Sequence, residues 1–104
     1  MAKEILTYCV DNKRISWQKH AFERMLERDI YKEEVKKTLL EGEVIEEYLD
    51  DKPYPSFLML RINKENKPLH VVASIDKQKQ WCYIITAYRP DKFHFEDDFK
   101  TRKK

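Results

Sequence analysis

The chain has 104 residues, enough for a single domain over residues 1–104 with one hydrophobic core. Hydrophobic residues make up 41% and charged residues 38%, which predicts a packed domain with a densely charged surface and a formal net charge of +2. The single glycine excludes the glycine-rich loops that hold the phosphates of dinucleotides and P-loop nucleotides, so no cofactor is expected.

The start of the chain favours neither secretion nor a membrane. Asp11 ends the first apolar stretch too soon for a signal peptide, and no run approaches membrane-spanning length, so we expect a cytoplasmic protein with no membrane contact. Cys9 and Cys82 lie far apart without a pairing motif, which favours reduced, buried thiols.

Apolar residues at helical spacing predict a first helix over residues 17–28, with Ser16 as its N-cap and Asp29 in a left-handed closing turn. These apolar residues are Ala21, Phe22, Met25 and Leu26. The segment before this helix, residues 5–10, fits either an edge strand or a short helix.

A second helix is predicted over residues 31–41, with Gly42 as its stop. Beyond Gly42 the apolar period changes to two, which predicts four strands at residues 44–49, 57–62, 69–75 and 81–88. We therefore expect an α+β fold in which two N-terminal helices pack on one face of a four-stranded antiparallel sheet.

Polar residues align along the first predicted helix. His20, Arg24 and Arg28 recur every four residues and form one stripe beside the apolar face, and Trp17 falls in the same sector. Guanidinium groups beside an indole are suited to hold a phosphate and stack a base. Either arginine could instead pair with neighbouring carboxylates.

A second polar group is expected on the last two strands. A hairpin about residues 76–79 would place His70 near Thr86 or Tyr88. An imidazole, a hydroxyl and a phenol at one end of the sheet could transfer protons and stabilise a pentacoordinate phosphate. The alternative is a core-edge histidine satisfied by a tyrosine hydroxyl. Cys82 could lie on the same face as a nucleophile, although packing is the commoner role. Periodicity predicts that the stripe and this group converge on one exposed groove.

The last part of the sequence contains an aromatic run followed by a basic tail. Phe93, His94, Phe95 and Phe99 predict a C-terminal clasp on the sheet without a catalytic role. The final basic residues could touch phosphates or form a frayed, solubilising terminus. These are Lys100, Arg102, Lys103 and Lys104. No spacing of histidines and cysteines predicts a metal site.

Several stretches resemble motifs of the domain-of-unknown-function 4258 (DUF4258) family. Its opening motif is similar to residues 16–30, except that Asp29 and Tyr31 stand where the family usually has Gly and a capping Ser. Its later motifs are similar to residues 53–56, 68–72, 84–90 and 93–100. That family resembles the RelE and MqsR groups of bacterial toxins, which are small α+β ribonucleases commonly encoded beside a zinc-finger or helix-turn-helix antitoxin.

The resemblance implies the toxin of a type II toxin–antitoxin pair, a metal-independent mRNA endoribonuclease with RNA and a cognate antitoxin protein as its partners. In such a reaction a base takes the proton of a ribose 2′-hydroxyl, whose oxygen attacks the adjacent phosphorus; the bond to the 5′-oxygen breaks, which leaves a 2′,3′-cyclic phosphate and a free 5′-hydroxyl. Acid–base and oxyanion roles are expected of His20, His70, Tyr88 and Thr86. Phosphate binding is expected of Arg24, Arg28 and Trp17. The alternative is a non-catalytic module that binds RNA or a protein.

Overall fold

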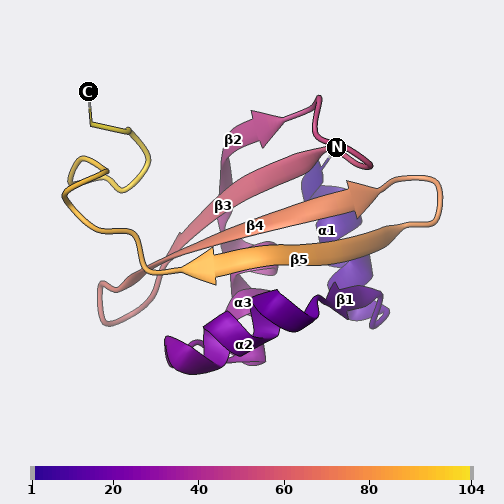
Figure 1. Cartoon of the computed structure of the whole chain (residues 1–104), viewed down its shortest axis with the longest axis horizontal. Helices are drawn as coiled ribbons and strands as arrows, with labels where there is room; N and C mark the ends of the chain where they lie inside the picture. The colour runs from indigo at the N-terminus through magenta and orange to yellow at the C-terminus, as the bar shows by residue number, and fades with distance from the viewer. Residues whose placement is uncertain (1, 104) are drawn as a thin grey trace.

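The computed structural model describes residues 2–103 and contains three helices and a five-stranded mixed sheet (Figure 1). The helices are α1 (Ala2–Asp11), α2 (Lys19–Glu27) and α3 (Lys32–Glu41). The strands are β1 (Ile15–Trp17), β2 (Glu43–Tyr48), β3 (Ser56–Ile62), β4 (Pro68–Asp76) and β5 (Trp81–Tyr88). The sheet order is β1-β5-β4-β3-β2, with β1 parallel to β5 and the other pairs antiparallel. Within residues 2–103, no helix has the length and apolar character that crossing a membrane requires.

The α+β class and the antiparallel order of β2–β5 are confirmed, but two parts of the prediction are wrong. The sheet is not four-stranded and antiparallel, because β1 adds a fifth, parallel strand. A third helix, α1, precedes β1. Residues 5–10, for which the sequence fitted either an edge strand or a short helix, therefore belong to a helix.

The start of α2 differs from the prediction because the backbone before it pairs with β5. Ser16 is not an N-cap; it lies in β1 opposite Tyr83, and Gln18 precedes the helix without a capping side-chain bond. Strand pairing gives these residues hydrogen-bond partners that another helical turn would have supplied. Asp29 has φ 55°, so the predicted left-handed turn after α2 is confirmed.

Gly42 ends α3 as predicted, but it does so with an extended backbone (φ −75°, ψ 178°). Glycine is required here because there is no room for a side chain. A Cβ at this position would lie 2.5 Å from the Thr38 carbonyl oxygen and 2.7 Å from the Leu60 carbonyl oxygen.

The predicted β4–β5 hairpin has His70 opposite Tyr88 and Val72 opposite Thr86. A bulge follows, because Ala73 pairs with Ile84 and Ile85 is left over. Strict alternation along β5, predicted from the sequence, is therefore wrong.

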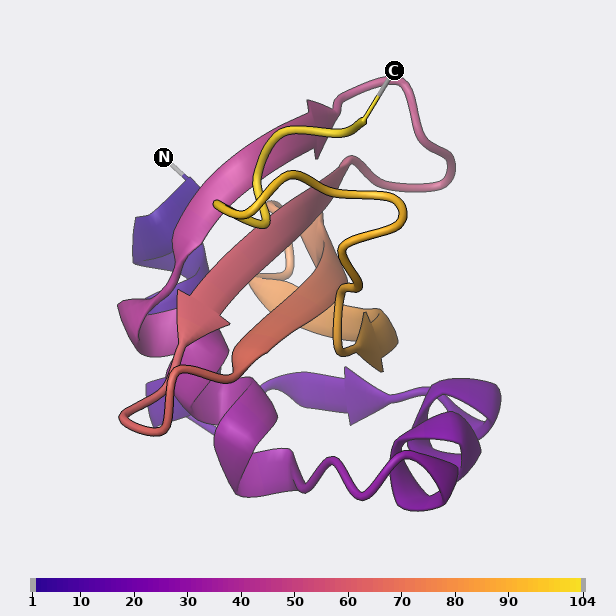
Figure 2. The ribbon, with the colours of Figure 1, turned by 90° about the vertical axis from the view of Figure 1, so that its left-hand side faces the viewer.

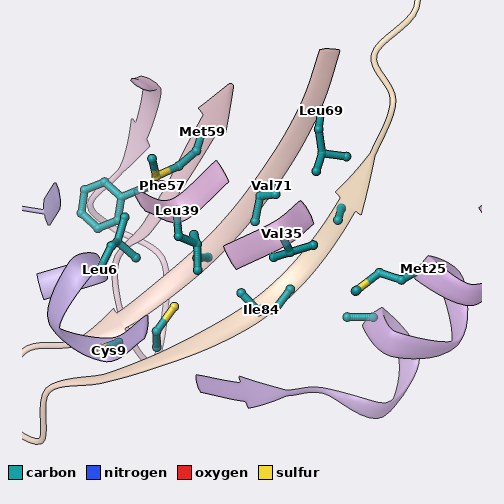
Figure 3. Packing of buried hydrophobic residues seen from close by; sticks show 14 of the residues in the cluster. Leu6, Cys9, Met25, Val35, Leu39, Phe57, Met59, Leu69, Val71 and Ile84 are labelled. Carbon is teal, nitrogen blue, oxygen red and sulfur yellow. The ribbon is translucent and has the colours of Figure 1, made fainter. Parts of the chain in front are cut away.

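The core lies between the sheet and the helices, where buried side chains from α1, α2 and α3 meet β3, β4 and β5 (Figure 3). They include Leu6, Met25, Val35, Leu39, Val71 and Ile84. The opposite side of the sheet, which we call the outer face, is crossed by residues 89–103, the C-terminal segment (Figure 2).

Candidate functional site

His20 and Arg24 of the predicted stripe lie on α2 and face solvent, and Arg28 directly follows the helix as its C-cap; we call these three residues the α2 basic face. The His20 side chain is 97% exposed, with Nδ1 3.7 Å from a Glu23 carboxylate oxygen. The Arg24 side chain is 66% exposed, with Nη1 3.9 Å from a Glu27 carboxylate oxygen. Exposed contacts one turn apart stabilise a helix by only about 0.3–0.5 kcal/mol, so an external phosphate can displace them.

Arg28 joins this face to the end of β5. Its Nη1 donates a hydrogen bond of 2.9 Å to the Ala87 carbonyl oxygen. β1 pairs with β5 only as far as Ile84, and α2 flanks the strand beyond that point (Figure 1). Arg28 thus supplies the donor that a neighbouring strand would otherwise supply.

The α2 basic face is turned away from α3. Ala21 and Met25 are buried in the core, and the Phe22 ring lies under the Lys32 ammonium group of α3, 4.8 Å away. Successive helical residues differ by about 100°, so Arg24, one residue before Met25, lies on the other side of the buried line from Phe22. This places the arginines along the edge of β5.

Trp17 does not join the stripe. It belongs to β1, so the helical geometry that grouped it with Arg24 does not apply. Its ring lies under the Lys32 ammonium group at 5.1 Å, on the side of the molecule that faces α3.

A hollow of about 290 Å³ opens on the outer face beside the start of α2, and we call it the tyrosine pocket. It is lined by Gln18, Pro53, Tyr54, Ser74, Tyr83 and Ile85. The rings of Tyr54 and Tyr83 stack with centroids 5.5 Å apart and an interplanar angle of 5°. A hydrogen bond to the Asp76 carboxylate raises the pKa of Tyr54 above its ordinary value.

These tyrosines were not predicted as functional residues. The signal available was Tyr83 alternating with the core residues Cys82 and Ile84, which puts an aromatic ring on the outer face. The partner, Tyr54, comes from the irregular loop between β2 and β3, and its position depends on tertiary contacts.

His70 is fully buried between the sheet and the C-terminal segment. Its Nδ1 lies 3.2 Å from the Tyr88 hydroxyl, and its Nε2 lies 2.7 Å from the Phe99 carbonyl oxygen. The Phe95 ring meets the imidazole edge-on at 4.7 Å. Both ring nitrogens therefore have protein partners.

The prediction that His20, Arg24, His70 and Tyr88 share one exposed groove is wrong, because His70 has no exposed surface. Burial lowers the pKa of His70 and raises the pKa of Tyr88, so both are held neutral. Thr86 is partly exposed beside the bulge. His70, which Tyr88 contacts from β5, holds the C-terminal segment through Phe95 and the Phe99 carbonyl.

The predicted C-terminal clasp forms, but only part of the aromatic run docks on the sheet. Phe95 is buried, whereas Phe93 is 89% exposed and His94 is exposed beside Asp91. Arg102 Nε and Nη2 donate to the two Glu46 carboxylate oxygens at 2.9 and 3.0 Å. The resulting hydrogen bonds lower the pKa of Glu46.

The basic tail is largely engaged by this docking. Lys100 lies 3.0 Å from a Glu43 carboxylate oxygen, and Arg102 is bound to Glu46, so neither extends freely toward a phosphate. Lys103 is exposed, and Lys104 lies outside the described residues.

The two cysteines are free and buried, as predicted. Cys82 faces the core and not His70, and burial raises its pKa to about 12, which argues against a nucleophile. Across residues 2–103, no three His, Cys, Asp or Glu side chains come together in a way that could hold a metal ion.

A family model described as "Domain of unknown function (DUF4258)" matches residues 17–89. The chain belongs to the DUF4258 family. Neither the curated proteins nor the solved structures gave a match. In this DUF4258 chain the matched region includes the α2 basic face and the tyrosine pocket, whereas α1 and nearly all of the C-terminal segment lie outside it.

Proposed function

We propose that this DUF4258 protein binds single-stranded RNA across α2 and the outer face, as the toxin ribonuclease of a type II toxin–antitoxin pair. The observation that carries the proposal is that Gln18, the residue before α2, also lines the tyrosine pocket, so the stacked tyrosines lie next to the start of the helix that carries His20 and Arg24. Arginine forks suit phosphates, and tyrosine rings suit bases.

For cleavage, the accessible groups are fewer than the sequence predicted. The His20 side chain is 97% exposed, and Arg24 lies one turn away on the same face, in position to hold a phosphate. His20 would take the proton of the ribose 2′-hydroxyl as this oxygen attacks phosphorus and would then give a proton to the 5′-oxygen that leaves, while Arg24, assisted by Arg28, stabilises negative charge on the non-bridging phosphate oxygens. Thr86 and Tyr88 of the β4–β5 group are both partly exposed, and the Tyr88 hydroxyl lies beside the buried His70.

The second candidate is an RNA-binding module without catalysis. The burial of His70 favours it, because the second histidine expected to take part in acid–base catalysis has no access to RNA. In either case, an antitoxin that covers the α2 basic face would block RNA, and an acidic surface on that partner would complement the arginines.

Incubation of the purified chain with single-stranded RNA in EDTA separates the candidates. For the nuclease we expect cleavage that persists in chelator, yields cyclic-phosphate ends and falls at least 100-fold in His20→Gln. Binding without cleavage favours the module. Absence of both binding and cleavage, for free and ribosome-bound RNA, would contradict the proposed function.

A further inference from the structure

A second cavity, of about 230 Å³, lies between α1, β1 and α3 and is separate from the tyrosine pocket. We call it the lysine pocket. It is lined by Val10, Lys13, Ile15, Trp17, Lys32 and Lys36, and this lining contains three ammonium groups and no carboxylate. Such a concentration of one charge at a partly apolar cavity is suited to an anion.

Lys32 is positioned by aromatic rings, which leave its charge available. Its Nζ lies 5.1 Å from the Trp17 ring centroid and 4.8 Å from that of Phe22. A cation–π contact orients an ammonium group without neutralising it. Among the ion pairs formed within residues 2–103, none involves Lys13 or Lys32.

Lys36 has one competitor for its charge. Its Nζ lies 3.4 Å from a Glu33 carboxylate oxygen, and the Glu33 side chain is 81% exposed. This is a single-turn contact at the surface, and Glu33 does not line the cavity. A more highly charged ligand inside the cavity can therefore take the ammonium group from it.

The volume and the lining residues of the lysine pocket limit the kind of ligand that it can bind. The cavity is smaller than the ~300–1,000 Å³ typical of sites for whole drug-sized molecules, so a phosphate group with its sugar is a better match than a dinucleotide. Three ammonium groups match a terminal phosphate, which carries close to two negative charges, better than an internal phosphodiester, which carries one. Val10, Ile15 and Trp17 offer apolar contact to the attached group.

We propose that the lysine pocket binds a terminal phosphate monoester, carried either by a mononucleotide or by the 5′ end of an RNA strand. The proposal does not depend on cleavage or on the α2 basic face.

Trp17 fluorescence reads out the pocket, because a ligand that draws Lys32 away changes the environment of the indole. In the Trp81→Phe variant Trp17 is the only tryptophan. Adenosine 5′-monophosphate should change its emission saturably and broaden the phosphorus-31 signal of the ligand with the unmodified chain. We expect Lys32→Gln and Lys36→Gln to weaken binding at least tenfold, and Lys37→Gln, on the same helix but outside the pocket, to leave it within twofold.

Paired oligoribonucleotides of one sequence, with a 5′-phosphate or a 5′-hydroxyl, separate the two sources. Tighter binding of the 5′-phosphorylated strand assigns the pocket to RNA ends, and binding of the mononucleotide alone assigns it to a free nucleotide. The proposal is overturned if neither probe gives a saturable signal at millimolar concentration, or if Lys37→Gln weakens binding as much as Lys32→Gln does. Circular dichroism of each variant verifies that it is folded.

Discussion

The imidazole of His70 on β4 stands perpendicular to the ring of Phe95 in the C-terminal segment, with centroids 4.7 Å apart and planes at 89°. This edge-on contact, together with the hydrogen bond from His70 to the Phe99 carbonyl, fastens the segment to the outer face. The segment is therefore part of the folded domain.

Phe95→Ala should lower the free energy of unfolding by about 3 kcal/mol, because it removes a buried ring from the contact with His70. Urea unfolding measures this loss, and limited proteolysis should show cleavage within residues 89–103. Phe93→Ala is the matched control. Its ring is 89% exposed, so its effect should stay within about 0.5 kcal/mol. Equal losses in the two variants would contradict the docking role of Phe95.

Stability should fall as the pH is lowered through the range in which His70 titrates. Burial lowers the folded-state pKa of His70 below its ordinary value of 6.5, so the unfolded chain binds more protons in the window just below pH 6.5. The contribution is fully present above that window and is lost as pH falls toward the folded pKa. Acid therefore favours the unfolded chain, in which the imidazole is hydrated and free to take up a proton.

Urea titrations between pH 7.5 and 5 test this, with His70→Gln as comparison. The variant should show a smaller dependence on pH over this range. A steeper dependence in the variant would be inconsistent with a buried neutral imidazole. Three carboxylates have pKa values below their ordinary range, and their protonation should destabilise the fold only at more acidic pH. They are Asp91, Asp98 and Glu46.

Gly42→Ala should destabilise the protein by about 1–3 kcal/mol, since the added methyl group would meet two backbone carbonyl oxygens. The backbone at Gly42 has a negative φ, so conformational strain does not contribute. Thermal unfolding gives the loss. A melting temperature equal to that of the unchanged protein would show that α3 and β3 can separate without cost.

Arg24→Lys should weaken RNA binding about tenfold while leaving the melting temperature unchanged, because lysine keeps the charge but loses the planar fork. Arg61→Lys is the control, because Arg61 lies on β3, outside the α2 basic face, and pairs with Glu41; this variant should bind RNA as the unchanged protein does. Fluorescence anisotropy with a labelled oligoribonucleotide measures both. If Arg24→Lys binds as well as the unchanged protein, charge alone explains the surface.

Tyr83→Leu should reduce RNA affinity roughly fivefold or more, because stacking on an aromatic ring contributes about 1–3 kcal/mol per base. Tyr31→Leu provides the comparison, since Tyr31 is 65% exposed but lies outside the tyrosine pocket. The same anisotropy assay applies. Parallel losses in both variants would indicate a nonspecific effect of removing tyrosine.

Local patterns predicted the elements that depend on neighbouring residues. The alternation along β4 and the turn before Trp81 predicted that His70 lies near Thr86 or Tyr88, and the structure pairs it with Tyr88. The closing turn at Asp29 also follows from a local preference.

Features that depend on distant partners escaped prediction. Ser16 has the chemistry of an N-cap, yet β5 draws it into a strand. The bulge at Ile85 carries no sequence signal of its own, and it moves Ala87 into the core. For the candidate site, helical spacing grouped His20, Arg24 and Arg28 correctly, but the burial of His70 depends on a segment some 25 residues later, whose docking surface forms only in the folded protein.

The pairing of β1 with β5 has a consequence for biosynthesis. Ile15 pairs with Cys82, so β1, which is made before the other strands of the sheet, must wait for β5, which is made after them. Long-range pairing of this kind slows folding, because a large loop must close before the contact forms. A nascent chain arrested before Trp81 would leave β1 and one backbone edge of β4 without their strand partner. The full sheet can therefore form only after β5 has been made.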